Sequence, residues 1–166
     1  MTKISDRMSA ITIDRTFSQL PATVFAAFAK KEQKAQWFAG PTDGSEVERV
    51  LDCRTGGREV LEVRWPSDTV TRFEAKYHHV EAESRLVYSY DLYIDGALYS
   101  VSLADIVFEG RDGGTAMRFA ETTSYFSDQD LGEVTASRLH GTGAQMDMLA
   151  MHLSGETVTR TIDDCH

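Results

Sequence analysis

Glu121 is the polar residue whose position carries the most chemical information in this sequence. Residues 115–123 alternate between polar and apolar side chains, and Glu121 shares its parity with Met117 and Phe119, so its carboxylate is expected to point inward. A buried carboxylate without a partner is costly or acquires a raised pKa. Two alternatives follow: Glu121 is satisfied by a structural partner, or it is a polar anchor or acid–base group in a pocket.

Aromatic side chains at inward-facing strand positions form the second group of candidate site residues. They are Trp65, Phe73, Tyr77 and Phe119. These rings either fill the core or line an apolar pocket, and tyrosine suits a pocket because it joins an apolar ring to a hydroxyl. Trp37 and Phe38, at the end of a short predicted helix, either pack in the core or form a wall of the cavity mouth. Together with Glu121 and Met146, these aromatic residues are the candidate ligand-binding set.

The remaining polar residues do not form a recognisable catalytic or metal-binding set. Asp52 and Arg54 share parity beside a Gly-Gly turn, which predicts an outward-facing ion pair or a turn clamp. His78 and His79 are neighbours on a strand, so they point to opposite faces and cannot share a metal ion, and His79 is expected to face inward with Tyr77. The sequence contains no nucleophile elbow, phosphate-binding loop or metal-ligand spacing, and we therefore expect no metal and no cofactor.

The composition describes an acidic chain of ordinary hydrophobicity. Its 166 residues fit one domain, and 42% of them are hydrophobic, as in globular proteins. A formal net charge of −9 repels phosphate backbones, so we expect no nucleic-acid partner. The apolar runs are far shorter than the ~20 residues that cross a bilayer, and residues 1–10 carry no secretory signal, so we expect no membrane contact and a cytoplasmic location. Cys53 and Cys165 are accordingly expected to be free thiols.

The spacing of apolar residues predicts one sheet and three helices. Period-2 alternation predicts strands at 10–17, 46–54, 58–65, 70–80, 85–93, 98–109 and 115–123. Helical spacing predicts helices at 21–29, 31–37 and 133–153. In the last helix Leu139, Met146 and Leu149 belong to one apolar stripe, whereas Arg138 and Asp147 lie off it.

Short connections between successive strands imply antiparallel neighbours, and a sheet with one polar face must bury the other face against a helix. The sequence therefore predicts an α+β fold in the order β-α-α-β(6)-α, with a curved antiparallel sheet around a long C-terminal helix. We expect an N-terminal extension at 1–9, a single domain at 10–153 and a polar tail at 154–166.

Several segments follow one another in a characteristic order: Arg15–Phe17, Pro21–Phe28, Trp37-Phe38, Asp52–Gly57, Arg85–Tyr88, Ser102–Glu109, Gly113–Glu121 and His140–Gly143 with Leu149. In this order they resemble the START-like superfamily (SRPBCC, or helix-grip), and within it the branch named after the activator of heat-shock protein 90 ATPase. Many relatives carry Gly-Trp near the middle of the last helix, but here Gly143 precedes Ala144. The resemblance implies a hydrophobic cavity between sheet and helix; it does not imply one function, because members include binders, carriers, cyclases and chaperone regulators.

Three functions are consistent with the sequence. The first is binding of a small hydrophobic or aromatic molecule in the cavity, without a reaction. The second is an enzyme of cyclase, hydrolase or lyase type that uses Glu121 as acid or base with Tyr77 or His79 as partner. The third is a protein-interaction module, for which a chaperone partner is not expected because the sequence shows no charged docking stripe. The sequence leaves a homodimer open.

Overall fold

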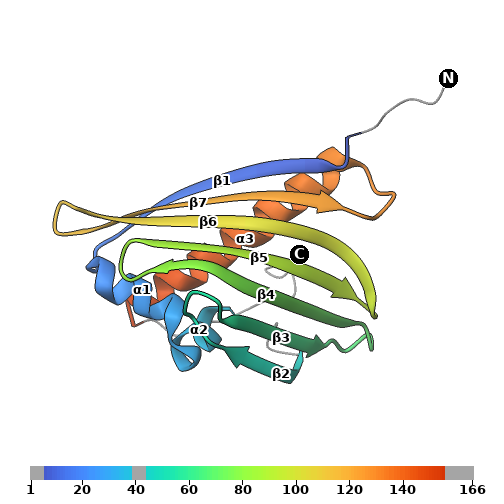
Figure 1. Ribbon diagram of the computed structural model, residues 1–166, viewed down its shortest axis with the longest axis horizontal. Coiled ribbons are helices and arrows are strands. Elements are labelled where there is room, and N and C mark those ends of the chain that lie inside the picture. The colour runs from blue at the N-terminus through green and yellow to red at the C-terminus, as the bar shows by residue number, and fades with distance from the viewer. Residues whose placement is uncertain (1–5, 39–43, 156–166) are drawn as a thin grey trace.

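The computed structural model describes residues 6–38 and 44–155 and shows one curved sheet with three helices (Figure 1). The strands are β1 (Met8–Phe17), β2 (Ser45–Leu51), β3 (Arg58–Arg64), β4 (Val70–Glu81), β5 (Arg85–Ile94), β6 (Ala97–Arg111) and β7 (Gly114–Tyr125). The helices are α1 (Pro21–Ala29), α2 (Lys31–Trp37) and α3 (Leu131–Leu153). The seven strands pair in the order β1-β7-β6-β5-β4-β3-β2, and all pairs are antiparallel. The predicted helix-grip α+β fold is confirmed.

The helix boundaries follow from local chemistry. Pro21 begins α1, where its missing N–H leaves no helical hydrogen bond unmade. The side chain of Asp130 caps α3 by accepting a hydrogen bond from the backbone N–H of Glu133 at 3.0 Å, which places the start two residues before the predicted position. Gly155, with φ of 78°, follows the last turn and suits the end of the helix. Among the described residues, no helix is long and apolar enough to span a membrane.

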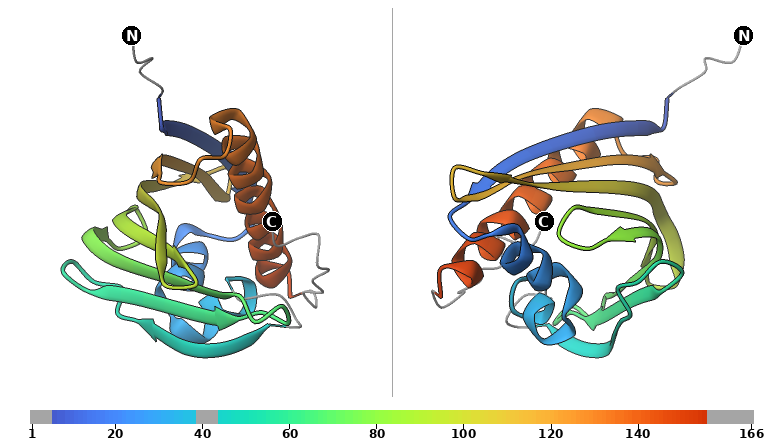
Figure 2. Two further views of the ribbon diagram at one scale, coloured as in Figure 1. Left: turned by 90° about the vertical axis from the view of Figure 1, so that its right-hand side faces the viewer. Right: turned by 60° about the vertical axis from the view of Figure 1, so that its left-hand side comes forward.

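All three helices lie on the concave side of the sheet (Figure 2), and we call this side the inner face. The backbone of α3 approaches β1, α1 and α2 most closely. The core between these elements includes Ile13, Phe28, Ile106, Met117 and Leu149, all nearly fully buried. α3 therefore covers the inner face mainly on the β1 side of the sheet.

The orientation of α3 differs from the predicted apolar stripe. Met146 and Leu149 are buried as predicted, but Leu139 is 44% exposed, while the side chain of Arg138 is only 12% exposed. The physical reason is that Arg138 faces a group of inward-pointing hydroxyl and carboxylate groups on the sheet, described below. Those groups need a cation, and this requirement sets the rotation of the helix more strongly than the burial of Leu139 does.

A β-bulge in β4 changes the direction of His79. The register with β5 passes from Tyr77 opposite Tyr88 to His79 opposite Val87. His79 therefore takes the parity of Val87 and not that of the buried Tyr88, and its side chain is 51% exposed. The prediction that His79 faces inward with Tyr77 is wrong, because sequence parity does not show a bulge.

The predicted strand 46–54 ends early, at Leu51, because the following residues form a tight turn. The backbone N–H of Gly57 donates to the carbonyl oxygen of Arg54 at 2.7 Å, and the backbone of Tyr77 bonds to both Gly56 and Gly57 at 2.9 Å. This turn fixes the end of β3 against the part of β4 that carries Tyr77.

Substitution of Gly57 by alanine tests how tightly this turn is packed. A Cβ atom at Gly57 would overlap the carbonyl oxygen of Asp52 and lie 2.9 Å from that of Arg54. We expect Gly57→Ala to lower the free energy of unfolding by about 1–3 kcal/mol, measured by chemical denaturation. Gly110→Ala is the control, because a Cβ there meets only the Cγ of Pro21 at 3.7 Å. Equal effects of the two substitutions would contradict this description of the turn.

Candidate functional site

Five aromatic rings form a continuous row on the inner face, and we call this row the aromatic wall. Phe38 follows α2, Phe73 and Tyr77 lie on β4, and Tyr88 and Tyr90 lie on β5. The ring centroids are separated by 5.2 Å from Phe38 to Phe73, 4.7 Å from Phe73 to Tyr90, 6.1 Å from Tyr90 to Tyr88 and 5.4 Å from Tyr88 to Tyr77. The tyrosines are buried, whereas Phe38 and Phe73 are only half-buried. One end of the wall is therefore accessible from outside the core.

Arg138 and Glu121 form the first of two buried ionic centres beside the wall, which we call the arginine centre. The guanidinium of Arg138 donates to the hydroxyls of Tyr90 at 2.7 Å and Tyr125 at 2.9 Å, and to Ser100 Oγ at 2.9 Å. Its Nη1 also lies 3.4 Å from Glu121 Oε1. The arginine comes from α3, and its partners come from the inner face of β5, β6 and β7.

The carboxylate of Glu121 is fully engaged in this centre. The hydroxyl of Tyr90 donates to Glu121 Oε2 at 2.7 Å, and that of Thr123 donates to Oε1 at 3.2 Å. Burial raises the pKa of Glu121, while the Arg138 charge and the hydrogen bond from Tyr90 oppose this shift. Burial also raises the pKa of Tyr90, so its hydroxyl stays protonated and can donate. Of the two alternatives for Glu121, the geometry fits a carboxylate with structural partners.

The acid–base pairing predicted for Glu121 does not form. The hydroxyl of Tyr77 donates to a different carboxylate, that of Glu59, at 2.7 Å. His79 lies outside the inner face and contacts Glu81 at 3.3 Å. An enzyme that combines Glu121 with either residue would need a different arrangement of these side chains.

Lys34 and Glu59 form the second buried ionic centre, the lysine centre. Lys34 Nζ lies 2.7 Å from Glu59 Oε1, and the two side chains are 4% and 3% exposed. The same oxygen accepts the hydrogen bond from Tyr77. The ammonium also lies 4.7 Å from the ring centroid of Phe38 and 5.9 Å from that of Tyr88, so it contacts the aromatic wall directly.

Sequence reasoning missed the lysine centre, although two signals were present. Glu59 shares strand parity with Trp65, which was predicted to face inward, and with the apolar residues Leu61 and Val63, which are buried. Lys34 precedes Trp37 by three residues, so both lie on the same face of α2. A carboxylate and an ammonium that both point into a core indicate a buried pair, because neither charge is stable there alone.

Cys53 lies next to the lysine centre and is half-buried. Burial raises the pKa of its thiol to about 11, while the charge of Lys34 opposes the shift. Burial, together with the charge of Glu59, also raises the pKa of Tyr77 well above its usual value. Both groups therefore stay protonated at neutral pH.

The other candidate residues lie outside the wall. Trp37 is 2% exposed and donates from Nε1 to the carbonyl oxygen of Ala27 at 2.9 Å, as a core residue would. Phe119 and Met146 are 4% and 2% exposed and belong to the packed core. Trp65 follows the end of β3, is half-buried, and donates to Thr71 Oγ1 at 2.9 Å. Phe38, Phe73 and Tyr77 are thus the predicted residues that the structure brings together.

Asp52 and Arg54 form the predicted outward-facing ion pair, with 2.9 Å between Oδ2 and Nε and side chains that are 45% and 76% exposed. Within residues 6–38 and 44–155, no three His, Cys, Asp or Glu side chains are grouped closely enough to hold a metal ion.

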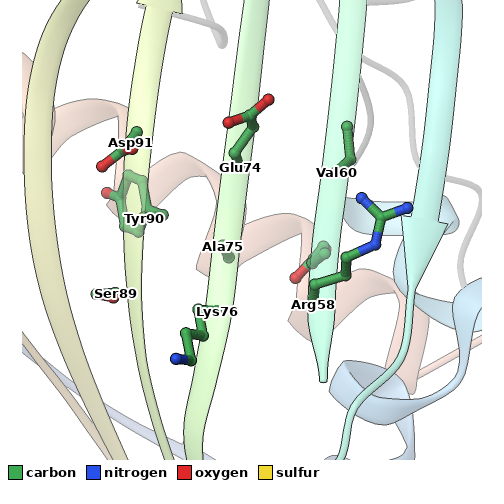
Figure 3. A pocket seen from close by; sticks show the side chains of 9 residues that line it. Arg58, Val60, Glu74, Ala75, Lys76, Ser89, Tyr90 and Asp91 are labelled. Carbon is green, nitrogen blue, oxygen red and sulfur yellow. The ribbon is translucent and has the colours of Figure 1, made fainter. Parts of the chain in front are cut away.

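A groove of about 310 Å³ lies on the opposite, convex face of the sheet, over β3, β4 and β5 (Figure 3). Arg58 on β3 lies opposite Lys76 on β4, and Glu74 on β4 lies opposite Asp91 on β5. This groove is charged and open, so it does not suit an apolar ligand. The inner face with the aromatic wall is the better candidate site.

The curved sheet, the long last helix and the partly accessible inner face define a protein of the START-like, helix-grip class. The chain belongs to the family described as "Activator of Hsp90 ATPase homolog 1-like protein", whose model matches residues 20–154. This confirms the branch that the sequence resemblance indicated.

Solved structures of similar proteins agree with this assignment. A putative uncharacterized protein from Rhizobium leguminosarum is 29% identical, with a TM-score of 0.83 over 90% of this chain and 96% of its own. The Mll3558 protein from Rhizobium loti is also 29% identical, with a TM-score of 0.77 over 87% of this chain and 96% of its own. Protein SA2116 of unknown function from Staphylococcus aureus shares the fold at 16% identity, with a TM-score of 0.74 over 89% of this chain and 94% of its own. No curated protein matches the chain.

Removal of Lys34 tests the strength of the lysine centre. Lys34→Met leaves the Glu59 carboxylate buried without its cation, and we expect the free energy of unfolding to fall by about 3–5 kcal/mol in chemical denaturation. In the double variant Lys34→Met/Glu59→Gln the loss should be smaller than the sum of the two single losses. Arg54→Met is the control, because it breaks an exposed ion pair and should change stability by less than about 1 kcal/mol. A loss for Lys34→Met no larger than for Arg54→Met would show that the buried pair is not important for stability.

The thiol of Cys53 provides a test of burial near the same centre. In a Cys165→Ser background, we expect alkylation by iodoacetamide to keep accelerating with pH towards a midpoint of about 11, because burial disfavours the thiolate. The same protein unfolded in denaturant should show a midpoint of about 8.5. Circular dichroism at each pH verifies that the fold is retained. A midpoint in the folded protein equal to that in denaturant would refute the predicted environment.

Proposed function

We propose that this protein binds a small aromatic or hydrophobic molecule on the inner face of the sheet, against the aromatic wall. The observation that carries the proposal is the half-buried state of Phe38 and Phe73 at one end of a row of rings that is otherwise buried. Such accessible apolar rings on a concave face are typical of ligand sites, which combine an apolar lining with a few polar groups.

The position of α3 supports this proposal. The backbone of α3 approaches β1, α1 and α2 most closely. It therefore packs less closely against the part of the inner face on β4 and β5, where side chains form the surface. Phe73 and its register partner Leu92 are both half-buried there. A planar ligand that stacks on Phe73 would be stabilised by the burial of its apolar surface. The aromatic contact would contribute about 0.5–1.5 kcal/mol more.

The buried tyrosines offer polar contacts at the inner end of the wall. Tyr90 and Tyr77 have their hydroxyls tied to the arginine and lysine centres, so their rings are held in fixed positions. Rigid rings favour binding because little side-chain freedom is lost when a ligand arrives. The wall is therefore a preorganised surface.

A regulator of a chaperone ATPase is the second candidate, because the matched family is described by that activity. The two functions differ in a simple observable: a regulator changes the ATPase rate of purified Hsp90, whereas a small-molecule binder is stabilised by ligands in the absence of any protein partner.

Binding to the wall is tested with a panel of uncharged aromatic compounds of one to three rings. We expect at least one compound to raise the melting temperature of the protein by mass action, and Phe73→Leu to weaken its affinity about tenfold through loss of ring contact. Leu103→Ala is the matched control, because Leu103 is 52% exposed and shares register with Ser89 and Thr122, away from the wall. A panel without any stabilising compound, or an affinity unaffected by Phe73→Leu, would contradict the proposal.

A further inference from the structure

Tyr88 differs from the other tyrosines of the aromatic wall. It is 7% exposed, and its hydroxyl makes no hydrogen bond with any described residue, whereas the hydroxyls of Tyr77 and Tyr90 are bonded to carboxylates. Among the described residues, no side-chain oxygen or nitrogen is both sealed from open space and unsatisfied. Within the part of the chain that the structure describes, the Tyr88 hydroxyl therefore lies next to space that a small atom can reach. A largely buried hydroxyl without a partner among these residues is rare and indicates an acceptor or donor supplied from outside them.

Lys34 presents unused donors to the same ring. Its ammonium has three N–H groups and donates one hydrogen bond among the described residues, to Glu59. Three aromatic rings also lie near it, with distances from Nζ to the ring centroid of 4.7 Å for Phe38, 5.9 Å for Tyr88 and 6.0 Å for Trp37. Aromatic faces partly stabilise the charge but do not accept a strong hydrogen bond.

The state of Tyr88 makes it a donor. Burial raises the pKa of its hydroxyl well above the usual value, and nearby Tyr90, Glu121 and Glu59 act in the same direction. The hydroxyl therefore keeps its proton at neutral pH and can offer it to an acceptor. An ammonium and a protonated hydroxyl beside the same ring recognise an oxygen that carries negative charge.

We propose that the ligand of the aromatic wall is an aromatic acid, whose carboxylate or phenolate oxygen is bound by the Tyr88 hydroxyl and the Lys34 ammonium. This inference rests on the proposed function and adds the class of ligand. The hydrophobic part of the molecule would stack on Phe73 and Phe38, and its anionic group would point towards the lysine centre. Glu121 and Arg138 meet the wall at Tyr90 and are not assigned to the anion.

Because the protein is acidic, a preference for an anionic ligand is a stringent test of the proposed site. At a formal net charge of −9, non-specific attraction of anions is disfavoured, so a preference for an acid over its uncharged analogue must come from local groups. The probes are 2-naphthoate and naphthalene, which share the ring system and differ in the carboxylate. Their affinities are measured by equilibrium dialysis at neutral pH.

We expect the wild-type protein to bind 2-naphthoate at least about tenfold more tightly than naphthalene. Tyr88→Phe should remove most of this preference, because the ring is kept and only the hydroxyl is lost. Lys34→Met/Glu59→Gln should also remove it, since this double variant eliminates the ammonium without leaving a buried unpaired charge. Tyr93→Phe is the control, because the Tyr93 hydroxyl contacts Asp91 at 3.4 Å and lies apart from the wall.

The outcomes separate this inference from the proposed function. If both probes bind equally, or if Tyr88→Phe leaves the preference intact, the assignment of an aromatic acid is overturned while binding to the wall stands. If neither probe nor any member of the uncharged panel binds, the proposed function fails and the inference fails with it. Circular dichroism and melting temperature of each variant verify that a lost preference does not result from loss of the fold.

Discussion

The contact between Arg138 and the inner face of the sheet constrains the arrangement of the whole protein. A guanidinium and a carboxylate can be buried only if both are paired and hydrogen-bonded, so α3 must lie where Arg138 meets Glu121, Tyr90, Tyr125 and Ser100 at once. An apolar helix could rotate or slide with little loss, because hydrophobic contacts are not directional. The arginine centre instead allows one rotation of α3, which exposes Leu139 and leaves the helix beside β1.

The lysine centre has a similar effect at the other end of the inner face. Lys34 is the side chain through which the short helix α2 reaches Glu59 on β3, and Tyr77 joins the same oxygen from β4. Phe38, directly after α2, is thereby placed against Phe73 at 5.2 Å between centroids. The accessible end of the aromatic wall thus depends on an ionic contact that is itself buried. Each centre consists of a cation from a helix, a carboxylate from a strand and a tyrosine hydroxyl that bridges to the wall.

Local periodicity was sufficient to predict the order of the elements and most of their boundaries. The alternation of apolar and polar residues in β1, β5 and β7 and the helix start at Pro21 depend only on neighbouring residues. Both are found in the structure. Part of the site was also predictable, because Phe73, Tyr77 and Glu121 follow strand parity inward. The rest depends on contacts between residues distant in sequence. The bulge that turns His79 outward, the rotation of α3 by Arg138 and the pairing of Lys34 with Glu59, 25 residues later, each require a partner that spacing along the chain does not show.

The pairing of charges in the core also restricts how this chain can diverge over evolutionary time. A substitution at Lys34 or at Glu59 alone strands the other charge in a medium that cannot solvate it, so the first step of an exchange passes through a poorly folded form. Viable descendants keep both residues or replace both within a short interval. The two positions are therefore expected to change together. In an alignment of relatives, residues 34 and 59 should covary more strongly than either does with its sequence neighbours.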